Sequence, residues 1–407
     1  MSEPLFNPFN PEFRADPYPF YARLREEAPV YHSPFGFTVL SRYEDVARTL
    51  RGNEFARDIE AHVELNPDDP RRARRERQQR RREEGRAAKV ILNLDPPDHT
   101  RLRRLVSLAF TPSAIERLRQ RVQQLVDEIL DRAAERGSIE LVDELAFPVP
   151  FQVISDLLDL PTDRSDEIRE WSSILTASIE PTVDEAMLDA AEDASASMDE
   201  FLSDVIAHRR RNLGDDLLSA LIQAEEEGDR LSEAELRSFV TLLYIAGHET
   251  TVNLIGNGTL ALLRHPDQLR RWASDPSLDS NAVDELLRYD GPVQETVRVP
   301  TVDVHYGDEV VTARTMVMTL LGSANHDPAV FDDPDTLRLD RPNANRHLAF
   351  AAGVHYCLGA SLAKLEAGVA ITSLIRRFPD LELAGEPGWR DRLTIRGVDH
   401  LPLHLRR

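Results

Sequence analysis

The residue best suited to chemistry in this sequence is its single cysteine, Cys357. It lies in the glycine-rich stretch F-A-A-G-V-H-Y-C-L-G at residues 350–359, where a loop is expected to become a helix. Backbone N–H groups and the positive end of a helix both favour a thiolate. Gly353 permits a tight turn, and Gly359 lets another group approach the backbone closely. Such a thiolate can ligate a metal or act as a nucleophile; the alternative is a small buried hydrophobic side chain.

Three further stretches combine charged, small and hydroxyl-bearing residues. The first is D-P-P-D-H-T-R-L-R at residues 95–103. The second is A-G-H-E-T-T at residues 246–251, inside a predicted helix whose glycines each cost about 1 kcal/mol relative to alanine and so need a local reason. The third is the pair Glu285 and Arg288, which by itself could be an ordinary helical ion pair.

In their order along the chain, from residue 95 to residue 359, the four motifs resemble those of the cytochrome P-450 family, whose haem-binding loop has the pattern F-x-x-G-x-H-x-C-x-G. The resemblance covers essentially the whole chain, so residues 1–407 are expected to form a single catalytic domain. It implies a mainly α fold with small β-sheets, a long central helix over the haem and the thiolate loop beneath it. The implied cofactor is haem b, iron protoporphyrin IX.

The resemblance makes Cys357 the axial ligand of the haem iron, where thiolate donation favours O–O cleavage. The haem propionates need cationic or hydrogen-bonding partners, because burial of an unpaired carboxylate costs free energy. The planar guanidinium of arginine suits a carboxylate. The implied propionate partners are His99, Arg103, Arg298 and His355. The other implied cofactor contacts are Ala246, Gly247, Phe350, Gly353 and Gly359. The simpler alternatives are a polar residue at a helix start for His99, a surface-strand charge for Arg298 and plain core for Phe350.

The haem loop departs from the family at one position. Bacterial members usually have glycine directly after the phenylalanine, whereas this chain has Ala351. Alanine disfavours a positive φ, so the path of the loop could differ locally. Because the other loop residues of the pattern remain, haem binding is still expected.

For catalysis, the resemblance singles out Glu249 and Thr250. Thr250 would hydrogen-bond the oxygen being activated or a water, and Glu249 would help relay protons from solvent. The alternative for Thr250 is a hydrogen bond to a backbone carbonyl one turn back. Glu285, Arg288 and Arg341 are expected to form a buried structural network behind the haem.

The substrate site is expected to be apolar, and its residues are positional inferences from the resemblance. The candidates are Leu242, Ile245, Ala246, Val293 and Thr296. Residues 168–196 would form a variable lid, and the arginine-rich residues 71–86 a second wall. That segment is either a solvated helix face or mobile loop, or a contact for an acidic substrate or partner. A steroid, terpenoid, polyketide or fatty acid would each be plausible.

Hydrophobic periodicity predicts the elements that must position these residues. Helices are expected over residues 17–27, 113–136, 151–158, 167–176, 188–210, 216–226 and 358–376. A longer helix runs from a capping box formed by Ser232 and Glu235 to about residue 264. Strands are expected at residues 37–40, in a hairpin over 297–319, and near Leu381, Leu393 and Leu401.

Composition limits the possible functions. The 407 residues carry 49 basic and 71 acidic side chains, a net charge of −22, which argues against nucleic-acid binding as the main role. One cysteine excludes internal disulfides and multi-cysteine metal sites. No stretch approaches the ~20 apolar residues of a membrane helix, and no secretory signal is evident, so a cytoplasmic protein without membrane attachment is expected.

The resulting hypothesis is a haem-thiolate monooxygenase that uses O2 and takes electrons from a separate ferredoxin and ferredoxin reductase, since no reductase domain is evident. A peroxide-driven peroxygenase is the alternative within enzymes, although the Glu249–Thr250 pair argues against it. A non-catalytic haem-based ligand sensor is the alternative from another class, and it would normally carry an output domain.

Overall fold

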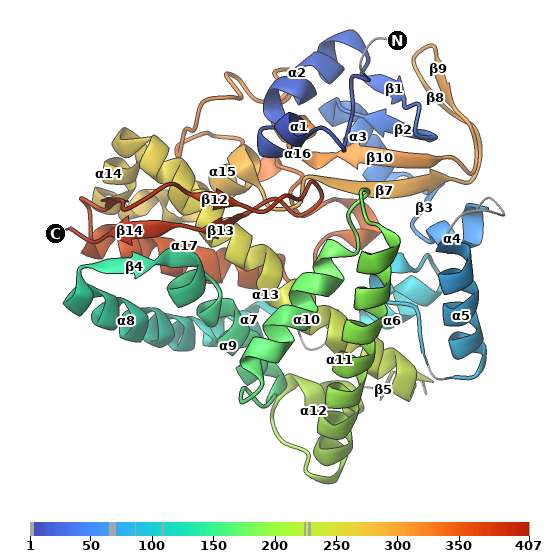
Figure 1. Cartoon of the computed structure of the whole chain (residues 1–407), viewed down its shortest axis with the longest axis horizontal. Helices are drawn as coiled ribbons and strands as arrows, with labels where there is room; N and C mark the ends of the chain where they lie inside the picture. The colour runs from blue at the N-terminus through green and yellow to red at the C-terminus, as the bar shows by residue number, and fades with distance from the viewer. Residues whose placement is uncertain are drawn as a thin grey trace.

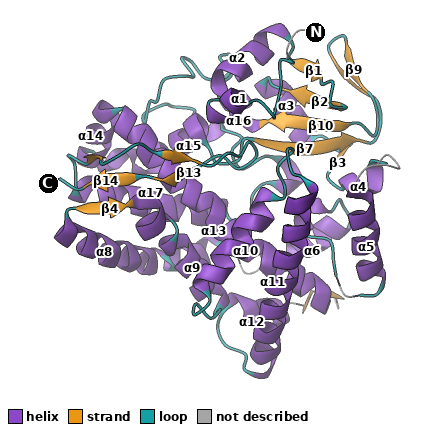
Figure 2. Cartoon of the chain, viewed as in Figure 1, coloured by secondary structure: helices purple, strands orange, loops and turns teal. Residues whose placement is uncertain are grey.

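The computed structural model describes residues 4–64, 71–85, 87–107, 110–223, 225–226 and 229–406. Most of the described chain is helical, with short strands gathered mainly beside the N-terminal helices and near the C-terminus (Figures 1 and 2). This arrangement agrees with the mainly α fold with small β-sheets that the sequence predicts. Among the described residues, no helix has the length and apolarity needed to cross a membrane.

The helices of the first half are α1 (Pro11–Ala15), α2 (Tyr18–Glu27), α3 (Tyr43–Arg51), α4 (Ile59–His62), α5 (Arg71–Glu83), α6 (Asp98–Ser107), α7 (Pro112–Arg117), α8 (Arg119–Arg136) and α9 (Pro148–Leu158). Those of the second half are α10 (Ser165–Ala177), α11 (Glu185–Arg211), α12 (Leu217–Gln223), α13 (Glu233–Arg264), α14 (Pro266–Ser274), α15 (Asp279–Asp290), α16 (Leu321–Asn325) and α17 (Ala360–Arg377).

The largest sheet has the strand order β1 (Val30–His32), β2 (Phe37–Leu40), β10 (Met316–Leu320), β7 (Glu295–Pro300) and β3 (Phe55–Ala56). A second sheet joins β11 (Glu382–Leu383), β14 (Pro402–His404) and β4 (Ser138–Glu140). Three two-stranded pairs are β5 (Glu225–Glu226) with β6 (Asp229–Arg230), β8 (Val304–Tyr306) with β9 (Glu309–Val311), and β12 (Gly388–Trp389) with β13 (Val398–His400). The predicted 297–319 hairpin is thus β7 paired with β10, and β8–β9 forms a smaller hairpin between them.

Helix α13 is the central helix, and the predicted capping box is present at its start. It is buried on nearly all sides from Val252 to Leu262, and packing explains its glycines. A Cβ on Gly256 would lie 2.6 Å from Val398 of β13, and one on Gly258 would lie 2.9 Å from Leu286 of α15. The glycines therefore let neighbouring elements approach the helix closely.

Three element predictions were wrong in detail. The helix over residues 113–136 is two helices, α7 and α8, which are separated at Leu118. The helix over 216–226 ends at Gln223, and Glu225–Glu226 is a strand. Residue 393 is not in a strand, because the N–H groups of Leu393, Thr394 and Ile395 donate to the carboxylate of Glu180 instead of a neighbouring strand.

Candidate active site

The loop that carries Cys357 is closed by backbone contacts. The N–H of Cys357 donates to the carbonyl of Phe350 at 3.1 Å, and that of Ala351 donates to Leu348. Gly353 has φ +72°, and a Cβ there would lie 2.4 Å from the carbonyl oxygen of Leu50. The tight turn expected at Gly353 therefore exists and presses against α3. Around Gly359, by contrast, no described atom lies within 4 Å of where a Cβ would be.

Cys357 lies three residues before the first residue of α17, and the residue as a whole is exposed. The N–H groups of Gly359 and Ala360 donate to its sulfur, and the Arg103 guanidinium lies close enough to favour the thiolate. Burial of the sulfur by the surrounding chain is the larger effect, and it raises the pKa of the thiol. The N–H donors expected from the sequence are present, but their effect on the pKa of the thiol is smaller than that of burial. A bound metal cation deprotonates a coordinating thiol directly.

Arginine and histidine side chains from three parts of the chain gather beside this loop. The rings of His99, on α6, and His355 lie 4.2 Å apart between centroids. Arg103, also on α6, donates to the carbonyl of Tyr356 at 2.8 Å. Arg298, on β7, is 3 % exposed, and its Nη1 donates to Thr296 and to the carbonyl of Val297. The structure therefore brings all four predicted propionate partners to one region.

The electrostatics show that this cluster holds an excess of positive charge. Burial and then the neighbouring charges of His99, Arg298, Arg57 and Arg103 lower the pKa of His355 to about 3. Burial and Arg57 lower the pKa of Arg298 to about 9. Asp95 is an anionic neighbour, but both of its oxygens accept from the backbone of residues 57 and 58.

Buried polar atoms in the same cluster lack partners. Within the described part of the chain, Nδ1 of His99, Nε2 of His355 and Nε of Arg57 have no hydrogen-bond partner. A cysteine sulfur flanked by buried, unpartnered nitrogens and excess positive charge fits a haem, which brings an iron and two carboxylates. Sequence reasoning missed Arg57. Its signal was indirect: it follows β3, which pairs with the strand that carries Arg298.

On α13, the residues of the A-G-H-E-T-T motif face different neighbours. Ala246 is exposed although the helix around it is largely buried. The hydroxyl of Thr250 donates to the Ala246 carbonyl at 3.1 Å, the backbone contact that was the alternative for this residue. A Cβ on Gly247 would lie 3.1 Å from Ile154 of α9, so the glycine has a packing reason.

Glu249 is buried, and its carboxylate pairs with Arg390 and with Arg392, the latter at 3.4 Å. Both arginines lie between β12 and β13. Sequence reasoning missed them, because they lie 141 and 143 residues after Glu249 and no motif marks them. Arg392 also donates to the carbonyl and hydroxyl of Ser173 on α10.

The predicted substrate residues are partly buried except for Ala246, which is exposed. Leu242 and Ile245 of α13 pack against the main hydrophobic core. Val293 forms an isolated bridge with Ile395, and the hydroxyl of Thr296 accepts from Arg298. The predicted lid, residues 168–196, consists of most of α10, a connecting turn and the first part of α11, which lie side by side (Figure 1).

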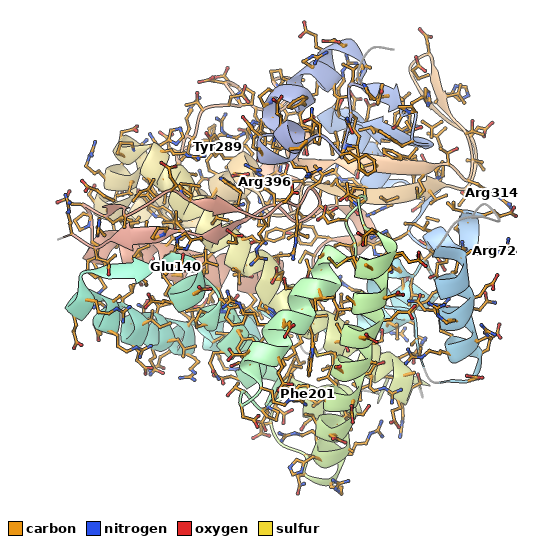
Figure 3. The ribbon with its side chains drawn as sticks, viewed as in Figure 1. Arg72, Glu140, Phe201, Tyr289, Arg314 and Arg396 are labelled. Atoms are coloured by element: carbon orange, nitrogen blue, oxygen red, sulfur yellow. The ribbon has the colours of Figure 1, made fainter. Side chains whose placement is uncertain are left out.

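The arginine-rich segment is helix α5, and Arg72 projects from its outer side (Figure 3). Its described arginines are largely engaged: Arg72 pairs with Glu76, Arg77 with Glu192 and Arg81 with Asp199. Arg81 and Arg82 also line a pocket of about 400 Å³ bounded by α5, α11 and α13. The side chains of Arg71 and Arg74 and all of Arg86 lie outside the described residues. These ion pairs favour the interpretation of this segment as a solvated helix face.

Glu285, Arg288 and Arg341 form the buried network that the sequence suggested. Arg288 Nε and Nη2 donate to the two oxygens of Glu285 at 2.7 and 2.9 Å. Arg341 Nε donates to the same carboxylate at 3.0 and 3.1 Å. Arg288 also donates to the carbonyls of Asn325, Pro334 and Thr336, and thereby ties α15 to the segment that precedes the cysteine loop.

Comparison with known proteins agrees with this geometry. The family model "Cytochrome P450" matches residues 58–273 and 278–387. The chain is 43% identical over 403 residues to cytochrome P450 107B1 of Saccharopolyspora erythraea, with 97% of this chain and 96% of that protein covered. It is 40% identical over 405 residues to the vitamin D(3) 25-hydroxylase of Pseudonocardia autotrophica, with 98% and 96% covered. Among solved structures, P450BioI in complex with a hexadec-9Z-enoic acid-ligated acyl carrier protein has a TM-score of 0.88 at 34% identity, with 97% and 99% covered.

Proposed function

Because this chain belongs to the cytochrome P450 family and is a haem-thiolate monooxygenase, we propose that Cys357 ligates the iron of a haem b and that residues 1–407 form one catalytic domain. The observation that carries the assignment is the cysteine loop beside a buried cationic cluster. Haem bound to a thiolate supplies the capacity to activate O2 and insert one oxygen atom into a C–H or C=C bond.

The chain's own residues hold and orient this cofactor. His99, Arg103, Arg298 and His355 are proposed to bind the two propionates, and Arg57 joins them because its Nε is buried without a partner among the described residues. Phe350 shields the sulfur side of the loop from water, and Gly353 sets its turn. Ala246 and Gly247 of α13 would contact the haem when it is bound, and the open space around Gly359 leaves its backbone accessible beside the sulfur.

Proton delivery is assigned to two residues of α13. The Thr250 hydroxyl now donates to the Ala246 carbonyl, and it can turn to donate to an acceptor on the cofactor side or to a water. The carboxylate of Glu249 accepts a proton from solvent and passes it toward Thr250. A peroxide-driven enzyme does not need residues that deliver protons for the activation of O2. The Glu249–Thr250 pair therefore favours the monooxygenase over the peroxygenase.

The substrate is a hydrophobic small molecule, and the electrons come from separate redox partners. We propose that Leu242, Ile245, Ala246, Val293 and Thr296 line its site. The names of similar proteins include a vitamin D(3) 25-hydroxylase, a polyketide biosynthesis cytochrome P450 and a complex with a fatty-acid-ligated acyl carrier protein, and they support a steroid-like, polyketide or fatty-acyl substrate. A ferredoxin and its reductase are the proposed donors. The cytoplasmic location expected from the sequence stays a prediction.

The axial ligand is tested by absorbance spectroscopy of purified protein reduced under carbon monoxide. We expect the wild type to show the strongly red-shifted band that gives the family its name, and Cys357→Ser to lose it while still binding haem. A colourless wild type after expression with ample haem, or an unchanged spectrum in Cys357→Ser, would overturn the assignment. Turnover with reduced ferredoxin but not with peroxide alone would separate the two enzyme hypotheses.

A further inference from the structure

Glu249 of α13 contributes to the wall of a second pocket. This pocket has a volume of about 550 Å³, and Glu249, but not Thr250, contributes to its wall. The remaining wall comes from α10, from residues 180–187 and from residues 390–399. Polar side chains such as Ser173, Thr182 and Asp184 line it. A liquid water occupies about 30 Å³, so the pocket has room and partners for a chain of waters.

Two arginines hold the Glu249 carboxylate in the wall of this pocket. The Glu249 side chain is 6% exposed, and those of Arg390 and Arg392 are 15% and 12% exposed. A buried carboxylate left without a cation would be strongly disfavoured. Nη1 of Arg390 and Nη1 of Arg392 both approach its Oε1.

The segment that carries the arginines is itself anchored to the lid. Nη2 of Arg392 donates to the carbonyl oxygen and the hydroxyl of Ser173 at 3.1 and 3.0 Å. The carboxylate of Glu180, in the turn after α10, accepts from the N–H groups of residues 393–395 at 2.8–3.3 Å. The position of the arginines is therefore fixed from two sides, by α10 and by the turn that follows it.

We propose that this pocket is the solvent route for protons to Glu249, and that Arg390 and Arg392 are positioning residues that hold the Glu249 carboxylate between the pocket waters and Thr250. The inference rests on the proposed function. Each turnover takes up one substrate molecule, O2, two electrons and two protons, and releases one oxygenated product and one water. The electrons come from the redox partners, and the protons enter from pocket water through Glu249, which returns to the carboxylate when it passes each proton on.

The arginines are tested with Arg390→Ala, Arg392→Ala and their Lys counterparts. A general acid contributes roughly 10²–10⁴-fold, so loss of its positioning should lower product formed per electron consumed by about tenfold, with the difference appearing as hydrogen peroxide. The solvent deuterium isotope effect on turnover should rise, and Lys should restore much of the coupling. The substrate-induced spectral shift and the carbon monoxide band should stay unchanged. The matched control is Arg271→Ala, which breaks the surface pair with Asp340.

Two further experiments avoid dependence on one variant. Val183 lies in a loop and lines the pocket, so Val183→Trp should fill the pocket and leave the ion pairs of Glu249 intact. This variant should release more hydrogen peroxide and show a larger solvent deuterium isotope effect on turnover. A double-mutant cycle combines Arg390→Ala with Glu249→Gln and measures the free energy of unfolding, which does not depend on turnover. The two changes in this free energy should be non-additive. Unchanged coupling and isotope effect in both arginine variants and in Val183→Trp, with a normal carbon monoxide band, would overturn the proposal. Loss of that band in the wild type would overturn the proposed function instead.

Discussion

At the scale of single residues, Ala351 shows how the haem loop tolerates a residue where its relatives usually have glycine. Its φ is +58°, in the left-handed region where a Cβ is strained, so the alanine adopts a conformation that glycine would adopt at a lower local cost. This cost is of order 1–3 kcal/mol, and the extra backbone entropy of glycine offsets roughly 0.5–1 kcal/mol of it.

We therefore expect Ala351→Gly to raise the free energy of unfolding of the haem-loaded protein by about 1 kcal/mol. Denaturant unfolding followed by haem absorbance measures this change. The neighbouring Ala352 has an extended conformation with φ −155°, so Ala352→Gly should lower the stability instead. Equal destabilisation by both substitutions would show that the conformation of residue 351 is not the source of strain.

Glu285 should be required for the folded protein. Its carboxylate accepts from two buried arginines and from the N–H of Arg338. Removal of one member of such a network costs about 3–5 kcal/mol, because the remaining charges are left buried without a partner. Glu285→Ala should therefore abolish recovery of haem-loaded protein, as measured by absorbance per milligram of purified protein. Asp340→Ala, which removes a surface partner of Arg271, is the control and should load normally.

The sequence could predict residues that share a short motif, and it could not predict partners that only the fold brings together. Cys357, His355 and Glu285 were accessible because local spacing marks them. Arg57, Arg390 and Arg392 were not, because each lies outside the motif whose residues it contacts. The pKa of Cys357 was also inaccessible, since the balance between burial and N–H donation depends on the packed loop.

At the scale of elements, the same limit applies to helix α13. Periodicity and the capping box predicted its length, but the reason for its glycines lies on other elements, β13 and α15. The missing strand at residue 393 is a similar case. Glu180 takes the N–H groups that a neighbouring strand would otherwise accept, and no local pattern in residues 390–397 records this.

Gly256→Ala should destabilise the protein because its Cβ would lie 2.6 Å from Cγ2 of Val398. Overpacking of this kind costs about 1–3 kcal/mol, more than the helix propensity that alanine gains. Thermal unfolding of Gly256→Ala, alone and combined with Val398→Ala, measures the effect, and the second substitution should restore part of the loss. Gly368→Ala on α17 is the matched control. Its Cβ would lie 3.6 Å from Val283, so stability should hold or rise.

At the scale of the whole molecule, a strongly acidic chain concentrates buried positive charge at one place. The net charge is −22, yet the region beside Cys357 contains His99, His355, Arg57, Arg103 and Arg298. Composition alone points away from anionic ligands, whereas the fold gathers arginines from α6, from the residue that follows β3 and from β7, with His99 and His355 beside them. The ligand that this arrangement suits is a buried dianion rather than a polyanionic surface.

A buried acid next to this region should make the stability of the whole molecule depend on pH. Burial, with Glu180 as a like-charged neighbour, raises the pKa of Glu295 to about 7, although Thr394 donates to it and Arg57 lies nearby. A carboxyl with a raised pKa binds more protons in the folded state than in the unfolded state. Its contribution to stability is therefore favourable at low pH and is lost as pH rises from about 4.5 to about 7.

Glu295→Gln removes this titration and keeps an acceptor for Thr394. The difference in unfolding free energy between Glu295→Gln and the wild type should grow in favour of the variant by about 3 kcal/mol between pH 4.5 and pH 8. Urea unfolding of both proteins across this range measures it, and titrations shared by the two proteins cancel in the difference. A difference that stays constant with pH would show that Glu295 ionises normally in the folded protein, and that water or a cation reaches its carboxylate.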